Sequence, residues 1–178
     1  MKIMIMSDSH FMEQSKIEKI MKSHSVDCYI HCGDIHYNFQ PSNARNFYIV
    51  LGNNDYYPGH QELLVTIDNL VFFIVHGNRH DVNYTLDYLI ETARNKHADV
   101  VCFGHTHIAY FDEVDDLTLI NPGSLALPRG HYRKGTFAIF DTTERSCRYY
   151  NADDFQECNP FDHTNKSGFM GYLKSVFK

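Results

Sequence analysis

Five short groups of polar residues carry side chains that could bind metal ions. They are Asp8-Ser9-His10, Gly33-Asp34, Gly52-Asn53-Asn54-Asp55, His76-Gly77 and Gly104-His105-Thr106-His107. Carboxylate and amide oxygens mixed with imidazole nitrogens, without thiolates, suit divalent manganese, iron, nickel or zinc better than calcium or copper(I). The residue types therefore predict a metal site.

Each group follows a run of apolar residues with high β propensity: residues 3–6, 28–30, 47–51, 71–75 and 100–103. Open α/β sheets place their ligands beyond the carboxyl ends of the strands. Alternate residues of a strand end point the same way, so we expect Asp8 and His10 to converge on one ion. The same spacing predicts convergence of His105 and His107. Glycines 33, 52, 77 and 104 would permit tight turns and close approach.

Each residue alone also has a structural explanation. A single histidine at the end of a strand is usually a surface residue or a hydrogen-bonded core residue. Asp34 could cap a helix, and Asn53 could form an Asx turn. The metal site is favoured because all five groups occur together, each after a strand-like run.

The remaining pattern predicts an α/β fold with mixed sheets. We expect helices over 13–24 and 83–96, the second with Asn83 as N-cap. Asp68-Asn69 predicts a two-residue hairpin turn. The expected strands are 2–7, 27–32, 46–51, 62–67, 70–76, 99–103, 108–114, 117–121, 135–141 and 145–150.

Length and composition predict one domain over residues 1–150 and an extension over 151–178. The extension ends in an apolar stripe after Gly168, which predicts a short amphipathic helix packed on its own domain or on a copy of it. A homo-oligomer is therefore compatible with the sequence. A helix lying on a membrane surface is a weaker alternative, because Lys174 and Lys178 are its only basic residues after Gly168.

Charge and cysteine content narrow the function classes. The chain has 16 basic and 22 acidic residues, a net charge of −6, and no Lys/Arg block, which disfavours extended nucleic acid as a ligand. Five cysteines without a C-x-x-C pair predict free thiols in the cytoplasm. No apolar stretch is long enough to span a membrane.

Together with Asn121-Pro122-Gly123-Ser124, the order of the metal-binding groups resembles the calcineurin-like metallophosphoesterases. The resemblance covers roughly residues 1–150 and is greatest to their small single-domain bacterial and archaeal phosphodiesterase branch. It implies a four-layer α/β/β/α sandwich of two mixed β-sheets flanked by helices.

The resemblance also implies two divalent metal ions, with Mn²⁺ as the first choice and iron, nickel or zinc as alternatives. Asp34 would bridge them. The first ion would be held by Asp8, His10, Asp34 and His107, and the second by Asp34, Asn53, His76 and His105. The implied reaction is hydrolysis of small phosphodiesters by a bridging hydroxide.

Asn54 departs from the superfamily, which commonly has a histidine near the leaving oxygen at this position. An amide cannot donate a proton at neutral pH, so we expect slow turnover of alkyl esters. Asp55 would orient neighbouring groups, and His36 would reach the substrate or the metal ligands. Arg129 would bind a phosphoryl oxygen or form a structural ion pair.

The alternative function comes from another class of protein. The same fold resembles a retromer subunit in which the pocket is catalytically silent and apolar surfaces bind partners. The complete set of expected ligands argues against this role, while an aromatic content of 14% leaves it open. Tyr37, Tyr56 and Tyr57 could stack on a base or be ordinary aromatic residues at the rim.

Overall fold

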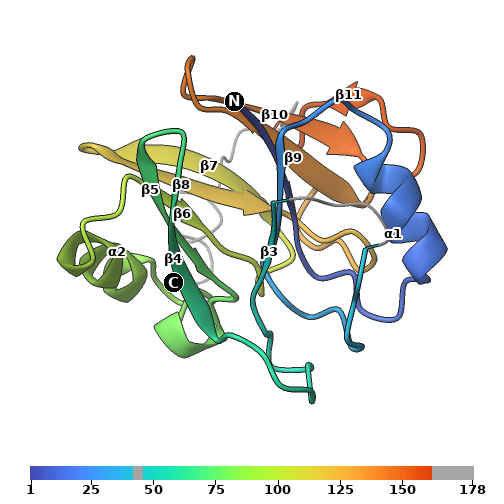
Figure 1. Cartoon of the computed structure of the whole chain (residues 1–178), viewed down its shortest axis with the longest axis horizontal. Coiled ribbons are helices and arrows are strands. Elements are labelled where there is room, and N and C mark those ends of the chain that lie inside the picture. The colour runs from blue at the N-terminus through green and yellow to red at the C-terminus, as the bar shows by residue number, and fades with distance from the viewer. Residues whose placement is uncertain (42–45, 162–178) are drawn as a thin grey trace.

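A computed structural model describes residues 1–41 and 46–161. Two mixed β-sheets pack face to face, and one α-helix covers each outer face (Figure 1). The predicted four-layer sandwich is confirmed. The helix predicted after Gly168 lies outside the described residues, and the division of the chain at residue 150 stays a prediction.

The elements follow in this order: β1 (Lys2–Met6), α1 (Gln14–Met21), β2 (Cys28–His31), β3 (Phe47–Ile49), β4 (Glu62–Ile67), β5 (Leu70–Val75), the 3₁₀ turn η1 (Asn78–His80), α2 (Asp87–Asn95), β6 (Val100–Cys102), β7 (Ala109–Val114), β8 (Leu117–Pro122), β9 (Thr136–Asp141), β10 (Ser146–Asn151) and β11 (Glu157–Cys158).

The first sheet has the strand order β11-β10-β9-β1-β2-β3, and the second has the order β4-β5-β6-β8-β7. In the first, β1, β2 and β3 are parallel neighbours. In the second, β5, β6 and β8 are parallel neighbours. The carboxyl ends of three parallel strands therefore meet at one edge of each sheet, and these are the ends that carry the predicted ligands.

Alternation along the central strands builds three apolar layers. Ile3 and Ile5 of β1 point between the sheets, whereas Met4 and Met6 point to the layer beneath α1. In β5, Phe72 and Ile74 point between the sheets and Phe73 packs on the side of α2. Both faces of these strands are buried, which is why they are continuous apolar runs in the sequence.

Two short-range features were predicted with different success. Asp68 and Asn69 form the two-residue turn between β4 and β5, with positive φ values of 52° and 65°, as the hairpin prediction requires. The predicted N-cap Asn83 is wrong, because α2 begins at Asp87 and Asn83 lies within 2.9 Å of the His105 ring instead. The helix predicted from residue 83 therefore starts four residues later, after the η1 turn and a short connecting segment.

Candidate metal centre

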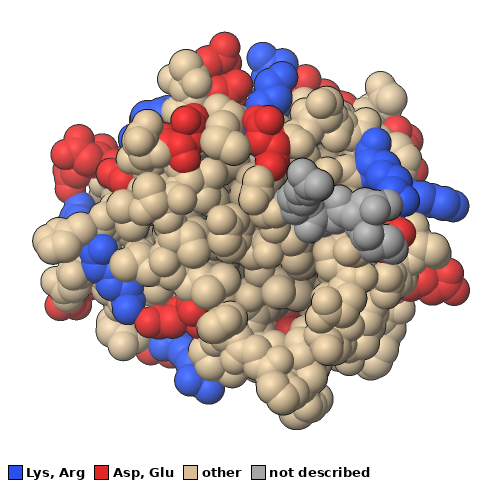
Figure 2. Space-filling model, in the orientation of Figure 1, with Lys and Arg blue, Asp and Glu red and all other residues tan. Residues whose placement is uncertain are grey.

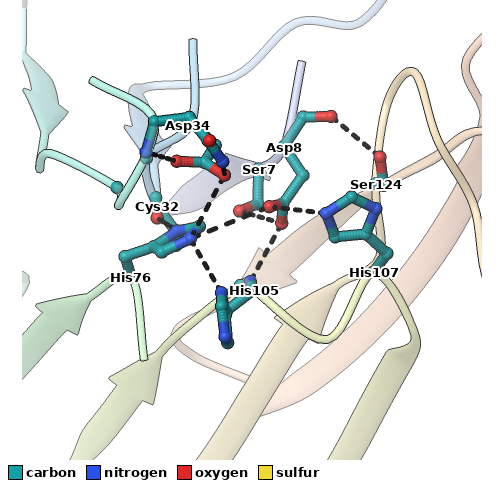
Figure 3. A network of polar contacts seen from close by, with 12 residues as sticks. Ser7, Asp8, Cys32, Asp34, His76, His105, His107 and Ser124 are labelled. Carbon is teal, nitrogen blue, oxygen red and sulfur yellow. Dashed lines mark hydrogen bonds and ion pairs between the residues drawn. The ribbon is translucent and has the colours of Figure 1, made fainter. Parts of the chain in front are cut away.

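Two groups of side chains converge where the two sheets meet. One consists of Asp8, His10 and His107, and the other of Asp8, Asp34 and His76; the ligand atoms of each group lie within 4.8 Å of one another. Figure 3 shows Asp8 between Asp34 and His76 on one side and His107 on the other. The carboxylate that the two groups share is Asp8.

Asp8 is fully buried and has one oxygen bound and one free. Ser7 Oγ donates to Oδ2 over 2.6 Å, and the backbone N–H of His105 donates to the same oxygen over 3.1 Å. Oδ1 lies 3.2 Å from His107 Nε2, yet it accepts no hydrogen bond from the described residues. Burial by itself would raise the pKa of Asp8, but His107 and His76 outweigh it and lower the pKa to about 2. An ionised carboxylate with an unused oxygen suits a cation.

His76 and His107 are held by backbone carbonyls. The distance from His76 Nδ1 to the Cys32 carbonyl oxygen is 2.8 Å, and that from His107 Nδ1 to the Leu127 carbonyl oxygen is 2.7 Å. A carbonyl can only accept, so Nδ1 carries the proton and donates in both rings. In a neutral ring with this tautomer, Nε2 presents a lone pair. Both Nε2 atoms face carboxylates, at 3.5 Å from Asp34 for His76 and 3.2 Å from Asp8 for His107.

In His10 and His105, one ring nitrogen also faces the centre, and the other nitrogen contacts a side chain outside it. His10 Nδ1 lies 2.8 Å from His36 Nε2, while its Nε2 lies 3.2 Å from His107 Nε2. His105 Nε2 lies 2.9 Å from the Asn83 amide, while its Nδ1 lies 3.3 Å from His76 Nε2. Burial lowers the pKa of both His10 and His105, which favours the neutral rings that metal ions bind.

The loop after β3 reaches the centre through Asn54. Its backbone N–H donates to Asp34 Oδ1 over 2.8 Å, and its Nδ2 donates to Asp34 Oδ2 over 2.6 Å. Asn53, the predicted ligand, is exposed, and its side chain has no hydrogen bond within the described part of the chain. The structure thus brings Asn54 to the carboxylate, and the role of Asn53 as a ligand stays a prediction.

Asp55 organises two loops at once. Its carboxylate accepts four backbone hydrogen bonds, from Asp34 (2.8 Å), Ile35 (2.9 Å), His36 (2.6 Å) and Gly52 (2.8 Å). It is buried, and these bonds tie the loop after β2 to the loop after β3. These bonds hold the backbone of Asp34, and the role of Asp55 in orienting its neighbours for catalysis stays a prediction.

The backbone at the centre differs from the geometry expected for strand ends. Both predicted pairs, Asp8 with His10 and His105 with His107, lie beyond the ends of β1 and β6 and have positive φ values between 47° and 68°. Asp34 has a φ of 58°. The pairs converge, but through left-handed loop conformations and not through strand alternation. Such strain in non-glycine residues is concentrated at functional sites.

Two glycines make room for the carboxylates. A Cβ at Gly104 would lie 1.9 Å from Ser7 Oγ and 2.7 Å from Asp8 Oδ2. A Cβ at Gly52 would lie 2.0 Å from Asp34 Oδ1. The close approach predicted for these glycines is therefore present.

Residues 121–124 support the centre from the second sheet. Ser124 Oγ donates to the Asp8 carbonyl over 2.8 Å, and Asn121 Nδ2 donates to the Gly104 carbonyl over 3.0 Å. Both residues are fully buried. In the sequence this segment supported only the family resemblance. Its hydrogen bonds, and the bond from Ser7 to Asp8, could not be predicted because no spacing rule indicates them.

Two other polar side chains lie outside these groups. His80 is buried between Phe73 and Tyr88, beneath α2. Arg129 is exposed and forms no ion pair with the described residues, and its backbone N–H donates to the His107 carbonyl over 3.0 Å. No helix in residues 1–41 and 46–161 is long and apolar enough to cross a membrane.

The donor set fits divalent metal ions. The buried Asp8 Oδ1 lacks a donor, and two histidines in their neutral form would present Nε2 lone pairs beside the carboxylates. A cation between these atoms would satisfy all of them.

Comparisons with known proteins agree with this site. The Calcineurin-like phosphoesterase superfamily domain matches residues 1–145. The chain is 35% identical to a probable metallophosphoesterase, YsnB, of Bacillus subtilis, over 85% of this chain and 91% of that protein. It is also 35% identical to the phosphodiesterase MJ0936 of Methanocaldococcus jannaschii, over 83% of this chain and 97% of that protein.

A solved structure supports the same relationship. The crystal structure of a predicted phosphoesterase from Streptococcus pneumoniae superposes with a TM-score of 0.74 and 26% identity, covering 85% of this chain and 90% of that chain. Sequence and fold lead to the same conclusion: the chain belongs to the calcineurin-like phosphoesterase superfamily.

Proposed function

We propose that the protein is a metal-dependent phosphodiesterase that hydrolyses small phosphodiesters at a dinuclear centre. The observation that carries the proposal is the pair of carboxylate–histidine groups that share Asp8. The name of the relative from Methanocaldococcus jannaschii supports the diester class.

The proposed metal ligands are Asp8, His10, Asp34, Asn53, His76, His105 and His107, and the proposed ions are two Mn²⁺. Bound ions would polarise the phosphoryl oxygens and activate a water for attack on phosphorus. Asp8 is shared by both groups, whereas Asp34 belongs to one. As the resemblance implies, Asp34 would bridge the two ions, and in this structure its carboxylate lies in the group that contains His76.

The other residues would hold the centre and the substrate. His36 would fix the His10 ring through Nδ1, and Asp55 would fix the backbone of Asp34. Arg129, exposed and near His107, would bind a phosphoryl oxygen. Asn54 would orient Asp34 and could hydrogen-bond the ester, but it would not protonate the leaving group.

The test is hydrolysis of bis-p-nitrophenyl phosphate and p-nitrophenyl phosphate by protein stripped of metal and then reloaded with Mn²⁺. We expect metal-dependent turnover that prefers the diester and is lost in Asp34→Asn. Asp116→Asn makes the same chemical change at an exposed turn and should keep the activity.

The missing general acid gives a second expectation. Ethyl p-nitrophenyl phosphate should release p-nitrophenol readily, whereas diethyl phosphate should be slower by a factor of about 100 to 10,000 beyond its intrinsic reactivity. Bound metal without turnover of any ester would instead favour a protein-binding scaffold.

A further inference from the structure

Several large apolar side chains near the metal centre in the sequence are exposed to solvent. Phe11 is 83% exposed and Tyr56 is 89% exposed. Phe11 directly follows His10, and Tyr56 directly follows Asp55. Leu127, which is 53% exposed, supplies the carbonyl that holds His107. Large exposed apolar side chains next to a polar site are typical of a binding surface.

His36 lies between Phe11 and the residue that precedes Tyr56. The Phe11 ring lies against the His36 ring, with 4.1 Å between the ring centroids. His36 contacts His10 through its ring and donates its backbone N–H to Asp55, the residue before Tyr56. Phe11 therefore contacts His36 directly, and Tyr56 directly follows a residue that His36 binds.

The other two tyrosines named from the sequence are not available to a ligand in this way. Tyr37 and Tyr57 are partly buried and pack against the apolar layer beneath α1. The Tyr37 hydroxyl also donates to the Met12 carbonyl over 3.0 Å. Of these three tyrosines, the structure leaves Tyr56 as the exposed ring.

The surroundings are poor in charge. Between β3 and β4, Asp55 is the one Lys, Arg, Asp or Glu, and it is buried. The charged side chains visible in Figure 2 lie mostly around the margin of the face, and the lower right, where this segment projects in Figure 1, is almost uncharged. Such a surface suits an uncharged planar group better than a polyanion.

We propose that Phe11 and Tyr56 form an aromatic platform that selects phosphoesters carrying a planar aromatic substituent. This inference rests on the proposed phosphodiesterase function. The metal centre would hold the phosphoryl group while the substituent, an aryl ring or a nucleobase, stacks on the platform. Stacking on an exposed aromatic side chain should strengthen binding about tenfold.

The test compares ligands that differ only in the substituent. Binding of phenylphosphonate and methylphosphonate to the Mn²⁺-loaded protein is measured by calorimetry, because neither ligand requires turnover. We expect phenylphosphonate to bind about tenfold more tightly. In Phe11→Ser and Tyr56→Ser the ratio should fall toward one. Leu64→Ser, which changes an exposed apolar residue on β4, should keep the wild-type ratio.

A second pair distinguishes the two sources of the ring. Thymidine 5′-phosphate binding much more tightly than deoxyribose 5-phosphate would assign the platform to nucleobases, and equal binding of these two would assign it to simple aryl groups. Equal affinity for both phosphonates, or an unchanged ratio in the Phe11 and Tyr56 variants, would overturn the platform. Turnover of methyl p-nitrophenyl phosphate is read separately, and its absence would count against the proposed function alone.

Discussion

Asp55 should contribute several kcal/mol to the stability of the fold through its four backbone hydrogen bonds. Asn has the same shape, but it keeps one carboxylate oxygen and replaces the other with an NH₂ group. Of the four backbone N–H groups that Asp55 accepts, two would then face a donor. At about 1.5–3 kcal/mol for each lost hydrogen bond to a charged group, Asp55→Asn should lower the free energy of unfolding by about 3–6 kcal/mol.

Urea unfolding at neutral pH, followed by circular dichroism, measures this loss in protein without metal. Asp116→Asn is the matched control and should stay within about 0.5 kcal/mol of wild type, because Asp116 is exposed in the turn between β7 and β8. A loss below about 1 kcal/mol in Asp55→Asn would refute the reasoning, since it would mean that the four amides find other acceptors.

Three further predictions concern buried groups. Burial lowers the pKa of His31 to about 4. Between about pH 6.5 and pH 4, His31 is therefore protonated in the unfolded chain but mostly neutral in the folded chain. The free energy of unfolding should fall by about 3 kcal/mol from this group as pH drops from about 6.5 to about 4, and His31→Asn should flatten that part of the stability–pH curve. Gly104→Ala should weaken Mn²⁺ binding in a calorimetric titration, because the new Cβ displaces Ser7 from Asp8, and the double variant with Ser7→Ala should recover part of the loss. Cys32 and Cys102 are fully buried with raised pKa values, so they should react with a thiol reagent at the rate of global unfolding, and rapid labelling of either in native protein would contradict the structure.

Much of the fold could be predicted because its strands have clear patterns. The central runs are apolar on both faces, and Asp68-Asn69 gives a turn whose chemistry matches its conformation. The start of α2 could not be predicted in the same way. Asn83 has the residue type of an N-cap, but a tertiary contact with His105 uses its side chain instead.

The candidate site was partly predictable for a similar reason. Residue types after the parallel strands indicate which side chains meet, so Asp8, Asp34 and His76 could be named from the sequence. The left-handed conformations of Asp8 and Asp34 could not be predicted, since αL geometry in a non-glycine residue depends on surrounding hydrogen bonds. The carbonyls of Cys32 and Leu127 were missed because backbone partners carry no sequence signal.

The most direct test of the metal-centre account is the number of Mn²⁺ ions bound per chain, measured by calorimetry and elemental analysis on stripped protein. We expect two ions in wild type, and the loss of both in Asp8→Ala, because Asp8 belongs to both ligand groups. His36→Ala, which removes an outer partner of His10, should weaken one site and leave the other bound. Two tightly bound ions in Asp8→Ala, or none in wild type, would contradict the account.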